Sequence, residues 1–221
     1  MATSTCAICA TPCPPVFRPP PPELSPDLDR RPGEPTRSTL AQWLLACEGC
    51  GAVAPDLSKL PEGRAEIVES EAYLSLAARP PEATPFLRFA MLCRPGDRAG
   101  AFLQAAWAAD DANDEDAARH YRREAAAHWG EPDGADSALR LVDVLRRAGM
   151  FTTAEEVASV VAEGAPDERS QAILAYQRAR IAEGDAARHL MSSALRPPAR
   201  TPHVAQKQAD RKGFLSRLLG R

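Results

Sequence analysis

Two pairs of cysteines, each with two residues between the thiols, place the tightest constraint on how this chain can fold. The first pair is Cys6 and Cys9, and the second is Cys47 and Cys50. A tight turn at this spacing directs both sulfur atoms toward one metal ion, and two such turns facing each other form a closed thiolate site. We therefore predict that the four cysteines bind a structural Zn²⁺. A site of four thiolates has no open coordination position, which argues against zinc-catalysed hydrolysis.

The two turns differ in how well their residues suit this geometry. Gly49 and Gly51 in the second turn can adopt the positive φ that a zinc knuckle requires, whereas Ala10 stands where the first turn would have a glycine. Residues 39–46 run into the second turn and are the best strand candidate of the N-terminal module. The second turn is therefore the more typical of the two.

A Pro-rich insertion separates the two turns. Residues 10–46 amount to 37 residues, more than the about 15–20 of an ordinary zinc ribbon. The run Pro19–Pro22 cannot be helical, so we expect an extended or polyproline conformation there. Asp27 and Asp29 also lie in the insertion. No nucleophile or base can be paired with them from the sequence, so we predict a turn or hydrogen bonds that support the knuckle.

Composition favours helices for the rest of the chain. Only 5% of the 221 residues are aromatic and alanine is abundant, which suits close-packed helices better than a β-sandwich. The net charge is −3, but residues 196–221 carry +6 and the remainder carries −9. An acidic body is a poor partner for polyanions, so nucleic-acid binding is not expected unless the tail alone provides it.

From about residue 97 the sequence repeats. Three similar junctions occur at Asn113, Gly149 and Gly184, with spacings of 36 and 35 residues. Each has a residue that can close a helix in the left-handed conformation, followed by residues that can start the next helix. A helix–turn–helix unit of about 34 residues is the tetratricopeptide pattern, so we predict three tetratricopeptide-like hairpins over 97–195. The expected N-terminal caps are Asp114, Thr152 and Asp185, and the third hairpin should present Ala187, Leu190, Met191 and Ala194 on one face.

Two further helices are expected before the repeats. One covers about 63–77 with Val68, Ala72 and Leu76 on one face, and a short apolar one follows the prolines near residue 80. This second helix carries Phe86, Phe89, Ala90 and Cys93, of which Cys93 should be a core residue. The fold class is thus mainly α with a small N-terminal β zinc-ribbon module. The expected organisation is a split ribbon over 1–52, connector and helices over 53–96, repeats over 97–195 and a basic tail over 196–221.

The chain resembles an uncharacterised bacterial family. The features that carry the resemblance are Asp27–Asp29, the segment Trp43–Gly51, and the apolar segments Phe89–Cys93 and Phe102–Trp107. Members of that family couple a split zinc ribbon to a C-terminal tetratricopeptide-like region, and the resemblance covers most of residues 5–130. It implies the same architecture for this chain, and it implies no activity.

These observations predict a non-enzymatic interaction protein. A zinc-stabilised module would be joined to a helical array whose groove accepts a protein or peptide partner. Phe214, Leu215, Leu218 and Leu219 form an amphipathic ending with basic neighbours, so weak contact with an anionic membrane surface is a second expectation for the tail. No secretory signal or bilayer-spanning run is visible. Six cysteines without such a signal indicate a reducing compartment, and we expect a cytoplasmic protein.

An alternative function depends on a fifth cysteine. Cys13 lies four residues after Cys9, and it could exchange with a metal ligand on oxidation. The protein would then be a thiol-based redox sensor or a metal-transfer protein. The competing interpretation of Cys13 is an incidental loop thiol, because only Arg18 lies near enough in sequence to lower its pKa. A third hypothesis is a nucleic-acid-associated ribbon that uses the basic tail.

Overall fold

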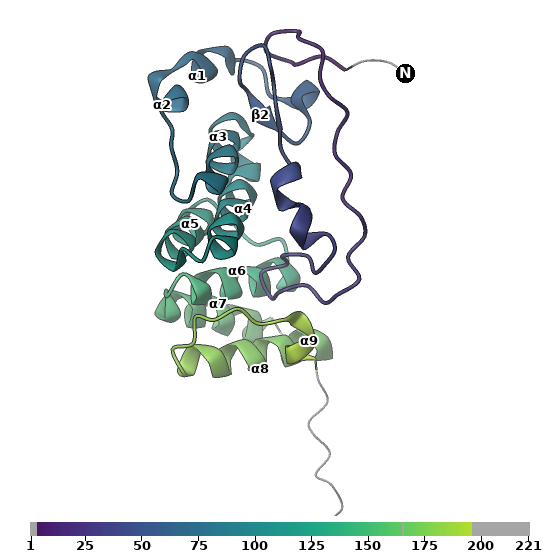
Figure 1. The fold of residues 1–221 in the computed structure, drawn as a ribbon. Helices are drawn as coiled ribbons and strands as arrows, with labels where there is room; N and C mark the ends of the chain where they lie inside the picture. Colours follow the sequence, from purple (N-terminus) through teal and green to yellow (C-terminus); the bar gives the residue numbers. More distant parts are fainter. Residues whose placement is uncertain (1–3, 165, 196–221) are drawn as a thin grey trace, which may run out of the picture.

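Helices make up most of the protein and follow one another along its length, while the N-terminal segment runs beside them (Figure 1). The computed structural model describes residues 4–164 and 166–195, so the predicted basic tail, 196–221, lies outside the described residues. The longer helices are α3 (Thr84–Leu92), α4 (Arg98–Asp111), α5 (Glu115–Ala127), α6 (Ala135–Arg147), α7 (Phe151–Glu163) and α8 (Glu168–Ala182). The shorter ones are α1 (Ala65–Glu69), α2 (Glu71–Leu74) and α9 (Met191–Ala194), with 3-10 turns η1 (Arg37–Gln42), η2 (Leu57–Lys59), η3 (Pro81–Ala83) and η4 (Pro95–Asp97).

One small antiparallel sheet accompanies the helices. Its strands are β1 (Leu45–Ala46) and β2 (Val53–Ala54), with Leu45 opposite Ala54. The prediction of a mainly helical protein with a small N-terminal sheet is therefore confirmed. Within residues 4–164 and 166–195, no helix has the length and apolar character needed to cross a membrane.

The predicted helix breaks occur where the sequence placed them. Asn113, Gly149 and Gly184 all have positive φ, at 58°, 76° and 64°. Asp114 caps α5 as expected, because its carboxylate accepts a hydrogen bond of 3.0 Å from the Ala117 amide. The other two predicted caps are wrong: Thr152 lies inside α7, and Asp185 precedes no helix.

The main apolar core forms around α4. Six of the buried residues of this helix are alanines, which allow neighbouring helices to approach closely. Trp107 of α4 is 3% exposed and packs edge to face on Trp43, with ring centroids 6.2 Å apart. The N-terminal segment therefore contributes an aromatic ring directly to the helical core.

Two local predictions before α3 are wrong. Residues 39–42 belong to the 3-10 turn η1, and only Leu45 and Ala46 of the predicted strand are in a strand. The helix expected over 63–77 is broken at Ser70, which has ψ 146° and uses its hydroxyl to cap α2. Because of this break Tyr73 is buried and Ala72 is exposed, whereas the unbroken helix would have buried Ala72. The apolar helix carrying Phe86 is confirmed as α3.

The segment predicted as the third repeat also differs from the prediction, because after Gly184 it forms only the short helix α9. Instead of a helix from residue 186, the chain is irregular up to Leu190, and α9 has four residues. The backbone of residues 189–191 instead forms hydrogen bonds with residues 26–28. The Leu28 amide donates to the His189 carbonyl at 3.0 Å, and the Met191 amide donates to the Pro26 carbonyl at 2.8 Å. An N-terminal segment thus takes the place of the missing helical turns.

The N-terminal segment that precedes η1 contains two parts, which we call the strap and the plug. The strap, residues 14–25, is mostly exposed and runs along one side of the molecule from the β1–β2 end toward α6 and α9 (Figure 1). The plug, residues 26–33, is mostly buried and follows directly. Leu28 of the plug is 1% exposed and packs in an apolar cluster with residues of α6, α7, α8 and α9. The strap therefore joins the cysteine pairs to the far end of the helical region.

Candidate metal centre

The four cysteines come together at one end of the molecule. The sulfur atoms of Cys6, Cys9, Cys47 and Cys50 all lie within 4.8 Å of one another. The Cys6 and Cys50 sulfurs are 3.9 Å apart, and the Cys9 and Cys47 sulfurs are 3.5 Å apart. A tetrahedral site with Zn–S bonds of about 2.3 Å has S···S edges of about 3.8 Å. The four cysteines are therefore positioned to hold a metal ion.

The two turns that carry these cysteines share one backbone pattern. In the first, the Ala10 amide donates to the Cys6 carbonyl at 2.9 Å; in the second, the Gly51 amide donates to the Cys47 carbonyl at 2.8 Å. Ala10 and Gly51 both have positive φ, at 59° and 73°. Ala10 thus adopts the conformation that a glycine would adopt more easily. The first turn forms despite the missing glycine.

Gly49 has a different role from the one expected. Its φ is not positive, but a Cβ added to it would lie 2.2 Å from Thr11 Oγ1 and 3.2 Å from Cys9 Sγ. The two turns approach each other so closely at this point that a side chain would push Thr11 away. Gly49 is therefore required for contact between the turns, whereas the positive φ belongs to Gly51.

The metal end shares its core with the first helices. Cys6 and Cys47 are buried in an apolar cluster that also contains Leu57, Val68 and Tyr73. The Tyr73 hydroxyl donates a 3.0 Å hydrogen bond to the carbonyl of Gly51, the residue that closes the second turn. Burial raises the pKa of Tyr73 to about 12, so this donor keeps its proton at neutral pH. The second turn is thus held by α2.

The environments of the thiols differ strongly. Burial raises the pKa of Cys6, and it raises the pKa of Cys50 to about 12. Cys9 is exposed, and hydrogen bonding to the Thr11 hydroxyl, 3.2 Å away, lowers its pKa to about 6. Four thiolates within 4.8 Å of one another would repel, and a divalent cation would remove that repulsion. Four cysteine sulfurs are a donor set compatible with zinc.

The other cysteines lie outside the cluster. Cys13 is half-buried, and burial raises its pKa. Cys93 is a core residue as predicted: it ends α3, is 2% exposed, and burial raises its pKa to about 11. Among the described residues, no other group of cysteine, histidine or carboxylate side chains is placed to hold a metal. His189 is instead bound to Asp185 at 2.8 Å.

A second cluster of polar and charged side chains was not expected from the sequence. Asp29 of the plug is fully buried, and its Oδ2 accepts hydrogen bonds from Trp107 Nε1 at 2.9 Å and from Arg147 at 2.9 Å. Arg122 lies 3.4 Å from the same oxygen. Asp110 completes the network by pairing with Arg122 at 2.6 Å and with Arg147 at 2.8 Å. One plug carboxylate thus contacts α4, α5 and α6.

The charges of this network balance. Burial alone would raise the pKa of Asp29, but the attraction of Arg147 and Arg122 outweighs it and lowers the pKa well below its usual value. Two carboxylates therefore face two buried guanidinium groups, since Arg122 and Arg147 are 1% and 6% exposed. Removing one member of such a network leaves an uncompensated buried charge, which costs about 3–5 kcal/mol. The expectation that Asp27 and Asp29 lie in a turn is correct, because the Arg30 amide donates to the Asp27 carbonyl at 3.0 Å. The Asp29 side chain, however, supports the helices and not the knuckle.

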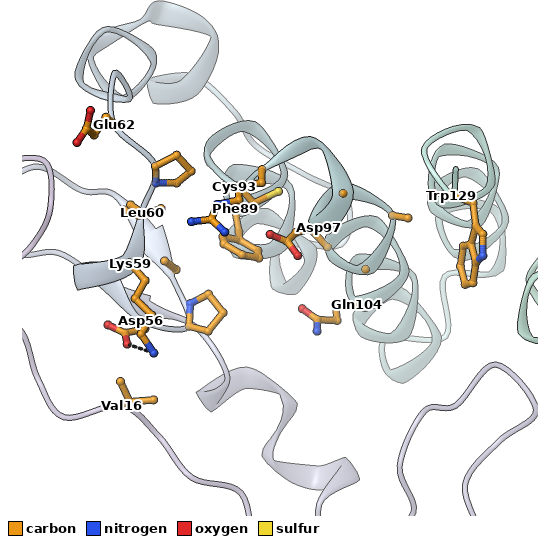
Figure 2. A pocket seen from close by; sticks show the side chains of 18 of the residues that line it. Val16, Asp56, Lys59, Leu60, Glu62, Phe89, Cys93, Asp97, Gln104 and Trp129 are labelled. Carbon is orange, nitrogen blue, oxygen red and sulfur yellow. Dashed lines mark ion pairs between the residues drawn. The ribbon is translucent and has the colours of Figure 1, made fainter. Parts of the chain in front are cut away.

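A cleft opens between the metal end and the helices. It has a volume of about 1330 Å³, larger than the ~300–1,000 Å³ typical of small-molecule pockets. One wall carries Asp56 and Lys59, paired at 3.2 Å, and Asp97 and Gln104 project toward it from the side of η4 and α4 (Figure 2). The cleft's lining also includes Val16 of the strap, Phe89, Trp129, and Ser137 and Arg140 of α6.

Comparison with protein-family models, with curated proteins and with solved structures gives no significant match. Of the resemblance to a bacterial zinc-ribbon family, the part that finds support is the cluster formed by Cys6, Cys9, Cys47 and Cys50. Function therefore has to be argued from the geometry of this cluster, the plug and the cleft.

Proposed function

We propose that this protein is a non-enzymatic, zinc-stabilised interaction protein. The observation that carries the proposal is the convergence of four sulfur atoms within 4.8 Å, from two turns with the same hydrogen-bond pattern. Four thiolates fill the coordination sphere of Zn²⁺, so the ion would join the two turns and would not activate water. Free thiols in all six cysteines fit a reducing compartment, and we propose a cytoplasmic location.

The helical region would supply the binding surface. We propose that α4–α5 and α6–α7 are tetratricopeptide-like hairpins, in support of which Asn113 and Gly149 close α4 and α6 with positive φ. The face where α4, α5 and α6 meet is filled by the plug through Asp29. The cleft is an open part of the helical surface, and its size favours a peptide segment over a small molecule.

The chemistry of the cleft suggests the kind of segment. Val16 is 44% exposed at its edge, and Phe89 and Trp129 offer further apolar surface. Glu62 and Asp97 are exposed carboxylates of the lining with no ion-pair partner among the described residues. Arg94 is an exposed basic residue of the same lining, so we propose a partner segment that carries apolar side chains together with charged ones of both signs.

The metal assignment is tested by zinc content. Protein purified without added metal should contain about one equivalent of zinc, and Cys47→Ser should contain none. Cys13→Ser is the matched control, because Cys13 lies outside the cluster. Wild-type protein with less than about half an equivalent would overturn the proposal, since one site of four thiolates binds one ion.

The cleft is tested at Gly100. A Cβ at this position meets nothing within 4 Å, so Gly100→Arg can project a side chain into the cleft without disturbing α4. Gly100→Ala is the control that adds only a methyl group. Once a partner protein is in hand, its affinity should fall for Gly100→Arg and persist for Gly100→Ala. Equal binding by both variants would place the partner elsewhere.

A second candidate function is suggested by Cys9. This ligand is exposed, and Thr11 lowers its pKa to about 6, so it is the thiol that an oxidant would attack first. The protein would then be a redox sensor or metal-transfer protein that releases zinc on oxidation. Cys13 is a poorer candidate for this role, because burial raises its pKa. Zinc release measured during peroxide titration tests the idea, and a site that keeps its zinc excludes it.

A further inference from the structure

A groove separate from the cleft lies between α1–α2, α3, the start of α4 and the end of α5 (Figure 1). Its volume is about 700 Å³, within the ~300–1,000 Å³ typical of small-molecule sites. It shares no lining residue with the cleft: α3 contributes Leu87 and Met91 to the groove and Phe89 to the cleft. The groove is therefore a second candidate binding site.

The walls of the groove are apolar and only partly covered by the protein. Five of its residues are large apolar side chains that are half-buried, namely Ile67, Leu76, Leu87, Met91 and Phe102. The Phe102 ring packs against the ring of His128, which also lines the groove, with centroids 5.1 Å apart. Covering the open parts of these side chains with an apolar molecule is favourable. The walls therefore suit a ligand with an apolar body.

One cation in this lining has no partner. Within residues 4–164 and 166–195, the Arg98 guanidinium forms no hydrogen bond or ion pair, although its Nε atom is buried. A buried donor without a partner is costly, and a carboxylate accepts two parallel hydrogen bonds from one guanidinium. Glu66, the single carboxylate of the lining, is exposed and does not pair with Arg98. An anionic group on the ligand would satisfy the guanidinium.

We propose that this groove binds a small apolar carboxylic acid. The carboxylate pairs with Arg98, and the hydrocarbon body lies against Met91 and Phe102. This site goes beyond the proposed function, because it shares no residue with the cleft and involves no metal.

Met91 reports occupancy of the groove directly. Met150 and Met191 pack in two other apolar clusters and serve as internal references. In the full-length protein labelled with ¹³C at the methionine methyl groups, octanoate below its micelle concentration should shift the Met91 signal to saturation. Met91→Leu identifies this signal, and the signals of Met150 and Met191 should stay in place. Equal shifts at all three would mean detergent-like uptake and would overturn the proposal.

The role of the charge is tested by comparing octanoate with octanol. A hydrogen bond to a charged group is strong enough that octanol should bind at least about tenfold more weakly. Arg98→Met removes the charge and keeps a good helix former, so it should weaken octanoate about tenfold and leave octanol unchanged. Arg169→Met, at an exposed arginine of α8 outside the groove, is the matched control and should bind octanoate as the wild type does. Equal affinity of the wild type for the acid and the alcohol would overturn the assignment.

A chain end with a free carboxylate is the competing occupant. Octanoate should bind more tightly than acetyl-trileucine, which joins an apolar body to the same anionic group. Tighter binding of the peptide, lost in Arg98→Met, would make the groove a site for protein chain ends and overturn the small-molecule proposal.

The groove and the cleft are distinguished at Gly100, which lines only the cleft. Gly100→Arg should bind octanoate with wild-type affinity. Loss of octanoate binding in this variant would overturn the separation of the two sites. If octanoate fails to shift Met91 while Gly100→Arg still weakens a protein partner, the proposed function stands and the groove proposal falls.

Discussion

The strap is held at its two ends by different physical means. At the metal end, four sulfurs converge in a small core, and the two turns meet so closely that a side chain at Gly49 would push Thr11 away. At the plug end, Asp29 is buried and bonded to a tryptophan and two arginine side chains from three helices. With the proposed zinc, the first anchor would depend on an ion that the solution supplies, whereas the second is complete within the chain. The strap is therefore fixed at one end by a contact that would depend on metal and at the other end by contacts within the chain.

The largest effect is expected from removal of the ion. Cys47→Ser, or chelation of the wild type, should free the amides of residues 4–13 and 45–54 for hydrogen exchange, because ligand binding is a major part of the stability of small zinc modules. The amides of residues 27–31 should stay protected, since the plug contacts do not involve the metal end. Exchange measured by mass spectrometry checks this, with Cys13→Ser as the control. Simultaneous loss of protection at both ends would show that the anchors are not independent.

A substitution at the other anchor should affect only the plug. Asp29→Asn removes the charge that Arg122 and Arg147 share and should lower the free energy of unfolding by about 3–5 kcal/mol. Zinc content should remain unchanged, because Asp29 makes no contact with the cysteine cluster. Urea unfolding measures the first quantity and metal analysis the second.

The matched control for this variant is Asp116→Asn, whose carboxylate is 98% exposed and should change stability by less than about 0.5 kcal/mol. A change of similar size in both variants would mean that the buried network contributes no more than a surface pair.

Acid should weaken the plug through the same carboxylate. Because the folded pKa of Asp29 lies below the unfolded value of about 3.9, its contribution is present above that value and is lost as the pH falls through the folded pKa. The difference in unfolding free energy between wild type and Asp29→Asn should therefore be constant from pH 5 to 8 and shrink below about pH 4. Stability curves for both proteins across this range check the sign. A difference that grows at low pH would contradict the assigned ion pairs.

The sequence predicted the metal end far better than the plug end. Two residues between thiols restrict each turn on their own, and Asn113, Gly149 and Gly184 mark helix ends through local conformation. The pairing of Asp29 with Arg147 joins residues 118 positions apart, and no local pattern encodes a contact at that distance.

A weak signal for the plug was nevertheless present. Asp29 follows a Pro-rich run, and Arg146 and Arg147 are adjacent in α6 next to its apolar stripe, where both are buried. Charged residues at buried positions of a helix require partners. The same long-range contact explains the wrong helix prediction after Gly184, because plug residues 26–28 bond to the backbone that the helix would have used.

A smaller effect at the metal end is expected from Gly49→Ala. The new Cβ would overlap Thr11 Oγ1 and crowd Cys9 Sγ, so the turns must separate, at a cost of about 1–3 kcal/mol and with weaker zinc binding. Competition with a zinc-binding dye measures the change. Combining the substitution with Thr11→Ala removes the closest atom and should recover part of the affinity. Failure of the double variant to recover would mean that Thr11 is not the obstacle.

The smallest predicted effects compare the two turns themselves. Gly51→Ala places a side chain at φ 73° with free space around it, so only the left-handed conformation is penalised, by about 1–2 kcal/mol. Ala10→Gly relieves the same penalty in the folded protein at φ 59°, but the greater freedom of glycine favours the unfolded chain by about 0.5–1 kcal/mol. We therefore expect the free energy of unfolding to rise by up to ~1 kcal/mol. Thermal unfolding of the zinc-loaded proteins measures both. Stability changes of opposite sign for the two substitutions would show that the turns are equivalent and differ only in this residue. Destabilisation by Ala10→Gly would mean that the Ala10 side chain makes a stabilising contact of its own.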